Sequence, residues 1–91
     1  MAADQAGFEG TWGGADGTRS AQVIVLNGQV IGFYWDDDYT DATNVRISAD
    51  GRVLSFAFAG GSATLTRTGE QTVSLEVRER EKVSHLSLKR D

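Results

Sequence analysis

The chain has no cysteine and no proline among its 91 residues. Without cysteine it has no disulfide framework, no thiolate nucleophile and no cysteine-based metal site. Without proline, and with 11 glycines, its turns must be built by residues that adopt positive φ. No apolar run approaches the roughly 20 residues of a membrane-spanning helix. These absences remove disulfide scaffolds, thiol enzymes and helical membrane spans from the classes to consider.

Basic charge is also scarce. Nine lysines and arginines face 13 aspartates and glutamates, which gives a net charge of −4 and a pI of about 4.8. Nucleic acids and anionic membranes are bound by basic surfaces, so we expect neither as a partner. The hydrophobic share of 40% and charged share of 24% are those of a folded globular chain. We expect one domain over residues 1–91, with residues 1–6 frayed.

His85 is the only histidine, so any acid–base or serine–histidine–aspartate scheme must use it. It falls on the outward side of the last expected strand, and the nearby Ser84 and Ser87 are close only in sequence. No nucleophile–base pair can be built from the spacing. We therefore expect no enzyme activity and no cofactor.

Turn signals divide the chain into eight segments of strand length that are rich in β-branched and aromatic residues. Asn-Gly and Asp-Gly pairs are strong hairpin signals because a type I′ turn needs positive φ at both central positions. The connections fall at Ala15-Asp16-Gly17, Asn27-Gly28, residues 36–41, Asp50-Gly51, Gly60-Gly61, Gly69-Glu70 and Arg80-Glu81. Short connections favour an up-and-down meander, and closure removes exposed edges. The sequence predicts an all-β fold, an eight-stranded antiparallel up-and-down β-barrel.

The second half of the chain alternates with period two, as half-buried strands do. One parity is apolar and should fill the interior. Its members are Val45, Ile47, Leu54, Phe56, Phe58, Ala63, Leu65, Val73, Leu75, Val77, Leu86 and Leu88.

The hairpin around Asn27-Gly28 is apolar on both faces. A two-residue turn pairs Leu26 with Gln29 and Val25 with Val30. One face then carries Ala21, Val23, Val25, Val30, Gly32 and Tyr34, and the other carries Ile24, Leu26, Ile31, Phe33 and Trp35. Since a barrel has one inside, we expect the second set to form a homo-oligomer interface. The alternative is a bulge or register slip that returns some of these residues to the core.

The opening Gly7-Phe8-Glu9-Gly10-Thr11-Trp12 resembles the glycine–x–x–glycine–x–tryptophan signature of the first strand in avidin-like and lipocalin-like barrels. The spacing to Gly32-Phe33-Tyr34 is similar to the avidin pattern on the third strand. The resemblance covers residues 7–36. It implies a streptavidin- or lipocalin-like barrel with a ligand at its open end. Trp12 would then close the barrel floor, while Thr18 and Tyr34 would supply hydroxyl groups near the ligand.

Aromatic residues gather near the expected open end. Aromatic faces bind apolar C–H surfaces, so we expect a small-molecule or saccharide site. Its predicted residues are Thr18, Tyr34, Trp35, Asp36 and Tyr39. Trp35 suits a ligand contact and an interface anchor equally, because tryptophan is favoured in both.

Asp36, Asp37, Asp38 and Asp41 form the densest charge cluster. The spacing lacks the glycine and final glutamate of an EF-hand loop. The simplest interpretation is a solvated hairpin tip without a metal. The alternative is Ca²⁺ held by Asp36, Asp38 and Asp41.

Taken together, these features predict a non-enzymatic binding module for a small molecule or saccharide, oligomeric through the hairpin around Asn27-Gly28. The alternative is a protein-interaction module, such as a lipocalin-like barrel of the protease-inhibitor type that binds a protein partner.

Overall fold

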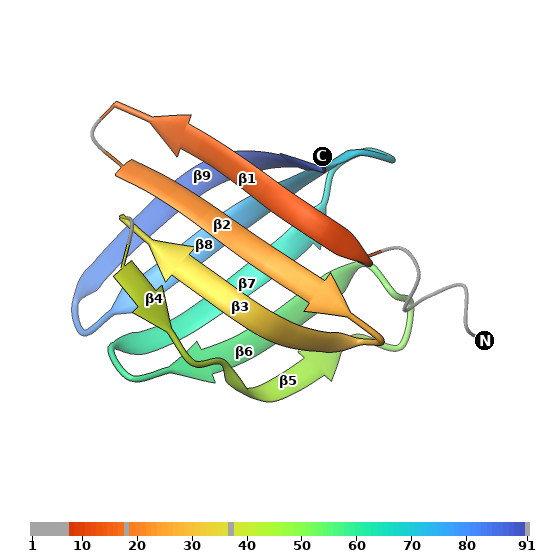
Figure 1. Ribbon diagram of the computed structural model, residues 1–91, viewed down its shortest axis with the longest axis horizontal. Coiled ribbons are helices and arrows are strands. Elements are labelled where there is room, and N and C mark those ends of the chain that lie inside the picture. The colour runs from red at the N-terminus through yellow and green to blue at the C-terminus, as the bar shows by residue number, and fades with distance from the viewer. Residues whose placement is uncertain (1–7, 18, 37, 91) are drawn as a thin grey trace.

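The computed structural model describes residues 8–17, 19–36 and 38–90. In these residues the chain forms one antiparallel sheet of nine strands (Figure 1). The strands are β1 (Gly10–Asp16), β2 (Arg19–Leu26), β3 (Gln29–Trp35), β4 (Asp38–Thr40), β5 (Thr43–Ile47), β6 (Val53–Phe58), β7 (Gly61–Arg67), β8 (Thr72–Glu79) and β9 (Lys82–Arg90).

The sheet consists of two meanders joined at β1 and β9. Its strand order is β4-β3-β2-β1-β9-β8-β7-β6-β5, so sequence neighbours pair everywhere except between β4 and β5. The joint pairs Trp12 with Arg90 and Gly13 with Lys89. The sheet curls so that β1–β4 lie over β6–β9, as Figure 1 shows. The result is a half-barrel that is open between β4 and β5.

The expected all-β antiparallel meander is confirmed, whereas the closed eight-stranded barrel is wrong. The additional strand is β4, three residues long, which lies inside the segment expected to be a turn. After β4, Asn44 takes a φ of 54° and the register of β5 against β6 shifts between Thr43 and Arg46. Because such an irregularity bends a strand, β5 does not continue the ladder beside β4, and the sheet stays open.

The interior is filled with apolar side chains. The inward parity expected for the second half is buried from Leu54 through Leu88, while Val45, Ile47 and Phe58 are partly buried and pack against this core. No polar or charged residue is buried among those that the structure describes. The half-barrel therefore has a packed core where a hollow barrel would hold its ligand.

A β-bulge corrects the expected faces of the β2–β3 hairpin. Asn27 and Gly28 have φ values of 54° and 75°, as a type I′ turn requires. The expected pairing of Val25 with Val30 is observed, but Ile24 then faces Gly32, so Ile31 is the extra residue. Beyond Ile31, the residues of β3 lie on the opposite faces of the sheet from those expected.

Phe33 and Trp35 consequently point into the core, with exposed fractions of 0% and 7%. Their assignment to the outward face, and that of Tyr34 to the inward face, are wrong. The alternative of a bulge is confirmed.

Trp12 and Phe8 are fully buried at the end of the half-barrel where the chain enters β1. The indole Nε1 of Trp12 donates a 2.8 Å hydrogen bond to the Phe8 carbonyl oxygen. The Arg90 guanidinium lies 4.4 Å from the centroid of the Trp12 ring. Trp12 thus has the core-packing position expected from the sequence.

Glu9 fixes the β2–β3 turn. Its two carboxylate oxygens accept hydrogen bonds from the backbone N–H groups of Asn27, at 2.8 Å, and Gly28, at 2.9 Å. Both N–H groups belong to the turn, so one side chain ties the start of β1 to the hairpin that carries the bulge.

Replacing Glu9 with glutamine should lower the free energy of unfolding by about 1 kcal/mol, because the amide NH₂ cannot accept the second hydrogen bond. Thermal denaturation should show a decrease in Tm of roughly 4–8 °C for a domain of this size. Glu81→Gln removes the same charge from the β8–β9 turn and should leave Tm nearly unchanged. Equal effects of the two substitutions would contradict the role of Glu9.

Candidate functional site

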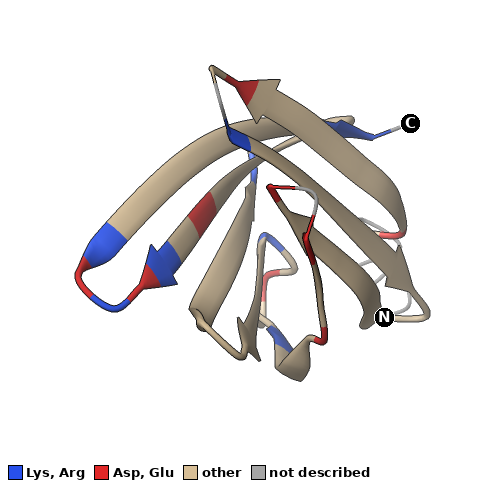
Figure 2. Ribbon diagram, turned by 60° about the vertical axis from the view of Figure 1, so that its left-hand side comes forward, with Lys and Arg blue, Asp and Glu red and all other residues tan. Residues whose placement is uncertain are grey.

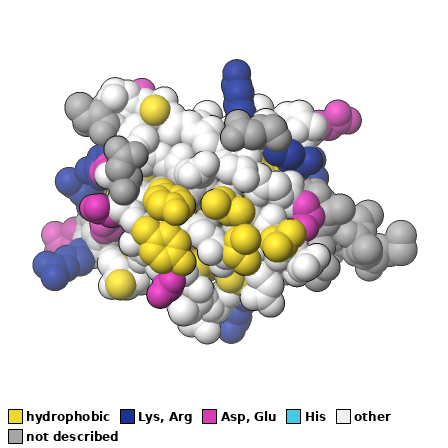
Figure 3. All heavy atoms as spheres, in the orientation of Figure 1, with side chains coloured by type: hydrophobic (Ala, Val, Ile, Leu, Met, Phe, Trp, Pro, Cys, Tyr) yellow, Lys and Arg dark blue, Asp and Glu magenta, His cyan; other side chains and the backbone are white. Residues whose placement is uncertain are grey.

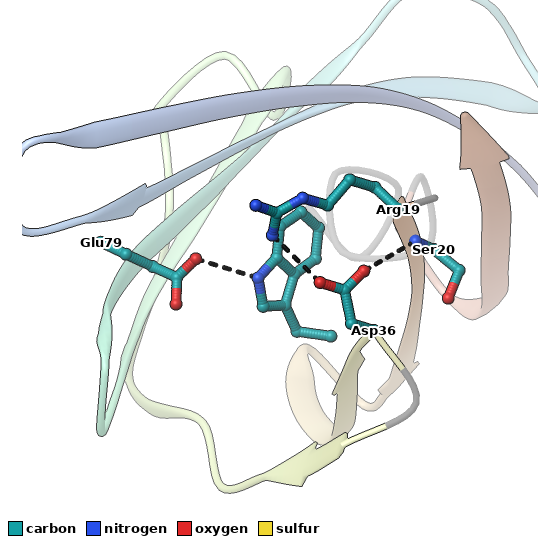
Figure 4. A network of polar contacts seen from close by, with 5 residues as sticks. Arg19, Ser20, Asp36 and Glu79 are labelled. Atoms are coloured by element: carbon teal, nitrogen blue, oxygen red, sulfur yellow. Dashed lines mark hydrogen bonds and ion pairs between the residues drawn. The ribbon is translucent and has the colours of Figure 1, made fainter. Parts of the chain in front are cut away.

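Trp35 is the last residue of β3, at the end of the half-barrel opposite the start of β1. Figure 4 shows the polar network at this end, formed by Arg19, Ser20, Asp36 and Glu79. The Trp35 indole Nε1 donates a 3.0 Å hydrogen bond to a carboxylate oxygen of Glu79, at the end of β8. The Arg19 guanidinium lies 5.3 Å from the centroid of the Trp35 ring. The side chain is therefore held between β2 and β8, and only 7% of it is exposed.

Asp36 locks the corner that follows Trp35. One carboxylate oxygen accepts from Arg19 Nη1 at 3.0 Å and the other from the Ser20 backbone N–H at 3.1 Å. The Asp36 backbone N–H donates to the Ser20 carbonyl oxygen at 2.8 Å, and Asp36 takes a φ of 53°. Asp36 thus turns the chain from β3 into β4 and is already bonded within the chain.

Tyr34 and Tyr39 meet on the outer side of the sheet. They face each other in the register of β3 with β4, and their ring centroids lie 5.4 Å apart in an edge-to-face arrangement. The Tyr39 hydroxyl donates a 2.9 Å hydrogen bond to Asp41. That bond and the charge of Asp41 raise the pKa of Tyr39.

The two tyrosines extend an apolar surface, which we call the outer face of β2–β4. Figure 3 shows apolar side chains gathered in the middle of this side of the molecule. Its members are Ile24, Leu26, Ile31, Tyr34 and Tyr39. Leu26 is 51% exposed, Ile31 52% and Tyr39 54%. A shallow concavity lined by Ser20, Ala21, Gln22 and Tyr34 adjoins it.

Charged side chains are scarce on this surface, where Asp41 meets it at the Tyr39 hydroxyl. Residues 20–35 contain no lysine, arginine, aspartate or glutamate. Charged residues lie mostly at turns and strand ends, as Figure 2 shows. The β2–β3 part of the outer face of β2–β4 is therefore both apolar and uncharged, and Asp41 borders it at Tyr39.

The structure divides the predicted site residues between two places. Tyr34 and Tyr39 come together outside, whereas Trp35 and Asp36 lie in the polar network at the end of β3. Thr18 lies outside the described residues. Of the predicted interface residues, Ile24, Leu26 and Ile31 lie on the outer face, and Phe33 and Trp35 lie in the core. The sequence interpretation did not place the tyrosines on this face; a glycine inside a strand, here Gly32, is the signal that could have indicated the bulge.

The aspartate cluster is dispersed. Asp36 is paired with Arg19 and Asp41 accepts from Tyr39, Asp38 is exposed on β4, and Asp37 lies outside the described residues. In the part of the chain that the structure describes, no three histidine, cysteine, aspartate or glutamate residues form a group that could hold a metal ion.

His85 lies on the outer side of β9, opposite Glu76 of β8. Its Nε2 is 3.1 Å from one Glu76 carboxylate oxygen, and Arg78 Nε donates to the other at 2.9 Å. The Arg78 hydrogen bond first, and that of His85 second, lower the pKa of Glu76. Arg78 and His85 thus meet one exposed carboxylate, and His85 lies on the outward side that its parity predicted.

No family model, no curated protein and no solved structure shows significant similarity to the chain. The described residues also contain no helix long and apolar enough to cross a membrane. Arguments about function therefore rest on the surfaces described above.

Glu76→Gln should destabilise the domain at about pH 7 and have much less effect at about pH 3. A carboxyl whose pKa is lowered in the folded state contributes stability above its unfolded-state pKa, and that contribution disappears as the pH falls through the folded-state value. Chemical denaturation at the two pH values measures the difference, with Glu81→Gln as the charge-matched control. A pH-independent effect of Glu76→Gln would refute the ion-pair explanation.

Proposed function

We propose that this chain is a non-enzymatic binding module that acts through the outer face of β2–β4, and that its first partner is a second copy of itself. The observation that carries the proposal is a group of half-exposed aliphatic and aromatic side chains, four of the five in residues 20–35, a segment without charge. Antiparallel sheets usually present polar side chains on their solvent side. A contiguous apolar exception is typical of an interaction surface.

Electrostatics support self-association through this face in particular. The chain carries a net charge of −4, so two copies repel each other where their acidic side chains approach. The β2–β3 part of the outer face of β2–β4 lacks charge, and contact through that part has no such cost. Two-fold symmetry is the commonest symmetry of homo-oligomers, and it would place this face of one copy against the same face of the other copy.

Ile31→Lys should convert the oligomer into a monomer, because a lysine at the centre of an apolar interface buries an unpaired charge. Sedimentation velocity over a range of concentrations measures the change. Val83→Lys is the matched control, since Val83 is also an exposed aliphatic residue, 45% exposed, on β9. A wild-type chain that stays monomeric at high concentration would rule out self-association, and a different protein, as for an inhibitor-type barrel, would then be the partner of this face.

The tyrosine pair supports a second candidate function, saccharide binding. The edge-to-face rings of Tyr34 and Tyr39 adjoin the concavity at Ser20 and Gln22, and Asp41 adds a carboxylate at the Tyr39 hydroxyl. Aromatic rings beside hydrogen-bonding groups suit the alternating C–H and hydroxyl surfaces of sugars. The resemblance of the opening segment to avidin-like and lipocalin-like barrels fits a ligand-binding role, which this proposal moves from the barrel interior to the outer surface.

Titration with a panel of neutral oligosaccharides should perturb the backbone amide signals of β3 and β4 in NMR spectra. Tyr34→Ala should abolish the response because it removes a stacking surface. Tyr39→Phe should retain most of it, since the ring remains and only the hydroxyl is lost. Identical responses of Tyr34→Ala and the wild type would eliminate this candidate.

A further inference from the structure

Arg52 and Arg67 lie side by side at the end of the sheet where β6 begins and β7 ends. The Arg67 backbone N–H donates a 2.9 Å hydrogen bond to the Arg52 carbonyl oxygen, next to the pair in which Val53 faces Thr66. Opposed residues of an antiparallel pair project from the same side of the sheet, where like charges destabilise. Two guanidinium groups therefore share one side of the sheet at a cost.

Among the described residues, neither Arg52 nor Arg67 has a carboxylate within ion-pair distance. The ion pairs of these residues involve Arg19, Arg78 and His85. Arg67 Nη2 reaches only the carbonyl oxygens of Gly69 and Glu70, each at 3.4 Å. The charge of this pair is thus not neutralised by a direct contact.

Asp50, the acidic residue of the adjacent turn, is engaged elsewhere. Its Oδ1 accepts from the Ser48 hydroxyl at 2.6 Å and from the Arg52 backbone N–H at 3.2 Å. These two hydrogen bonds lower the pKa of Asp50 and keep its carboxylate in the turn. The Arg52 guanidinium attracts this carboxylate only as a weaker, longer-range contribution.

The two arginines line a concavity between the β5–β6 and β7–β8 turns, which we call the arginine notch. Its lining residues are Asp50, Gly51, Arg52, Arg67, Thr68, Gly69 and Glu70. We propose that the arginine notch binds the phosphate group of free phosphate or of a small phosphate ester. A guanidinium matches the spacing of phosphate oxygens in a bidentate contact, and neither guanidinium has a carboxylate within ion-pair distance among the described residues.

Glu70 provides an internal check because it lines the same notch. Its carboxylate repels an incoming anion, so Glu70→Gln should strengthen phosphate binding while either arginine substitution weakens it. The notch shares no residue with the outer face of β2–β4. The proposal that the notch binds phosphate can therefore fail or hold independently of the proposed function.

The test is a titration of the ¹⁵N-labelled full chain with inorganic phosphate at low ionic strength and about pH 7.5, where phosphate is mostly a dianion. Saturable shifts should be confined to the amides of the two turns. Arg52→Gln and Arg67→Gln should each weaken binding about tenfold. Arg80→Gln removes the same charge from the β8–β9 turn, at the other end of β8, and should leave the affinity unchanged. The amide spectra of the variants report whether each one is folded.

Parallel titrations with glycerol phosphate and acetate identify the ligand. Tighter binding of glycerol phosphate than of inorganic phosphate assigns the notch to an ester, and the reverse assigns it to free phosphate. Acetate that binds as tightly as either one would overturn the assignment to phosphate. Shifts that do not saturate, or equal effects of Arg80→Gln and Arg52→Gln, would overturn the site itself.

Discussion

The bulge at Ile31 is the constraint on which the two surfaces of the N-terminal hairpin depend. On β2, Val23 and Val25 point inward, as the pairing set by the Asn27-Gly28 turn requires. The extra residue reverses the alternation, because side chains on a strand change face at every position. Phe33 therefore enters the core and Tyr34 moves to the outer face. The bulge thus provides core aromatic residues and an apolar outer face from one strand.

Side-chain contacts join the two meanders on the open side of the half-barrel, where β4 and β5 are the unpaired edges of the sheet. Phe33 of β3 reaches across to Phe56 and Phe58 of β6, with ring centroids 5.0 Å and 5.2 Å away. At one end, the hydrogen bond from Trp35 to Glu79 joins β3 to β8. These contacts hold the two meanders together opposite the β1–β9 joint. These apolar rings fill the interior, and the proposed function therefore uses the outside of the sheet.

Local signals made much of this fold predictable. The Asn27-Gly28 turn and the alternation of Leu54 and Phe56 each depend on residues close in sequence, and both occur as expected. The sequence pattern could not predict the bulge. Because β3 is apolar at both parities, a period of two does not indicate which of its residues face the core. β4 was missed because aspartate-rich segments have low strand propensity.

The candidate sites were less predictable than the fold because they depend on distant residues. The partners Trp35 and Glu79 are 44 positions apart, and no local pattern links them. The pairing of Tyr34 with Tyr39 requires the corner at Asp36 and the β4 strand that follows it. The outward position of His85 depended on parity alone, and the structure agrees with it. Sequence patterns thus predicted which side of a regular strand faces outward. They did not predict contacts that depend on how residues far apart in the sequence are aligned.

The distribution of charge distinguishes the edges of this open sheet from its face. An unpaired edge can recruit strands from other chains, and proteins protect it with short strands, bulges and charged side chains. Here β4 is short and carries Asp38, while β5 has an irregular register and carries the exposed Arg46. The outer face of β2–β4 has no comparable protection. The proposed association uses side chains on that face and needs no strand pairing at either edge.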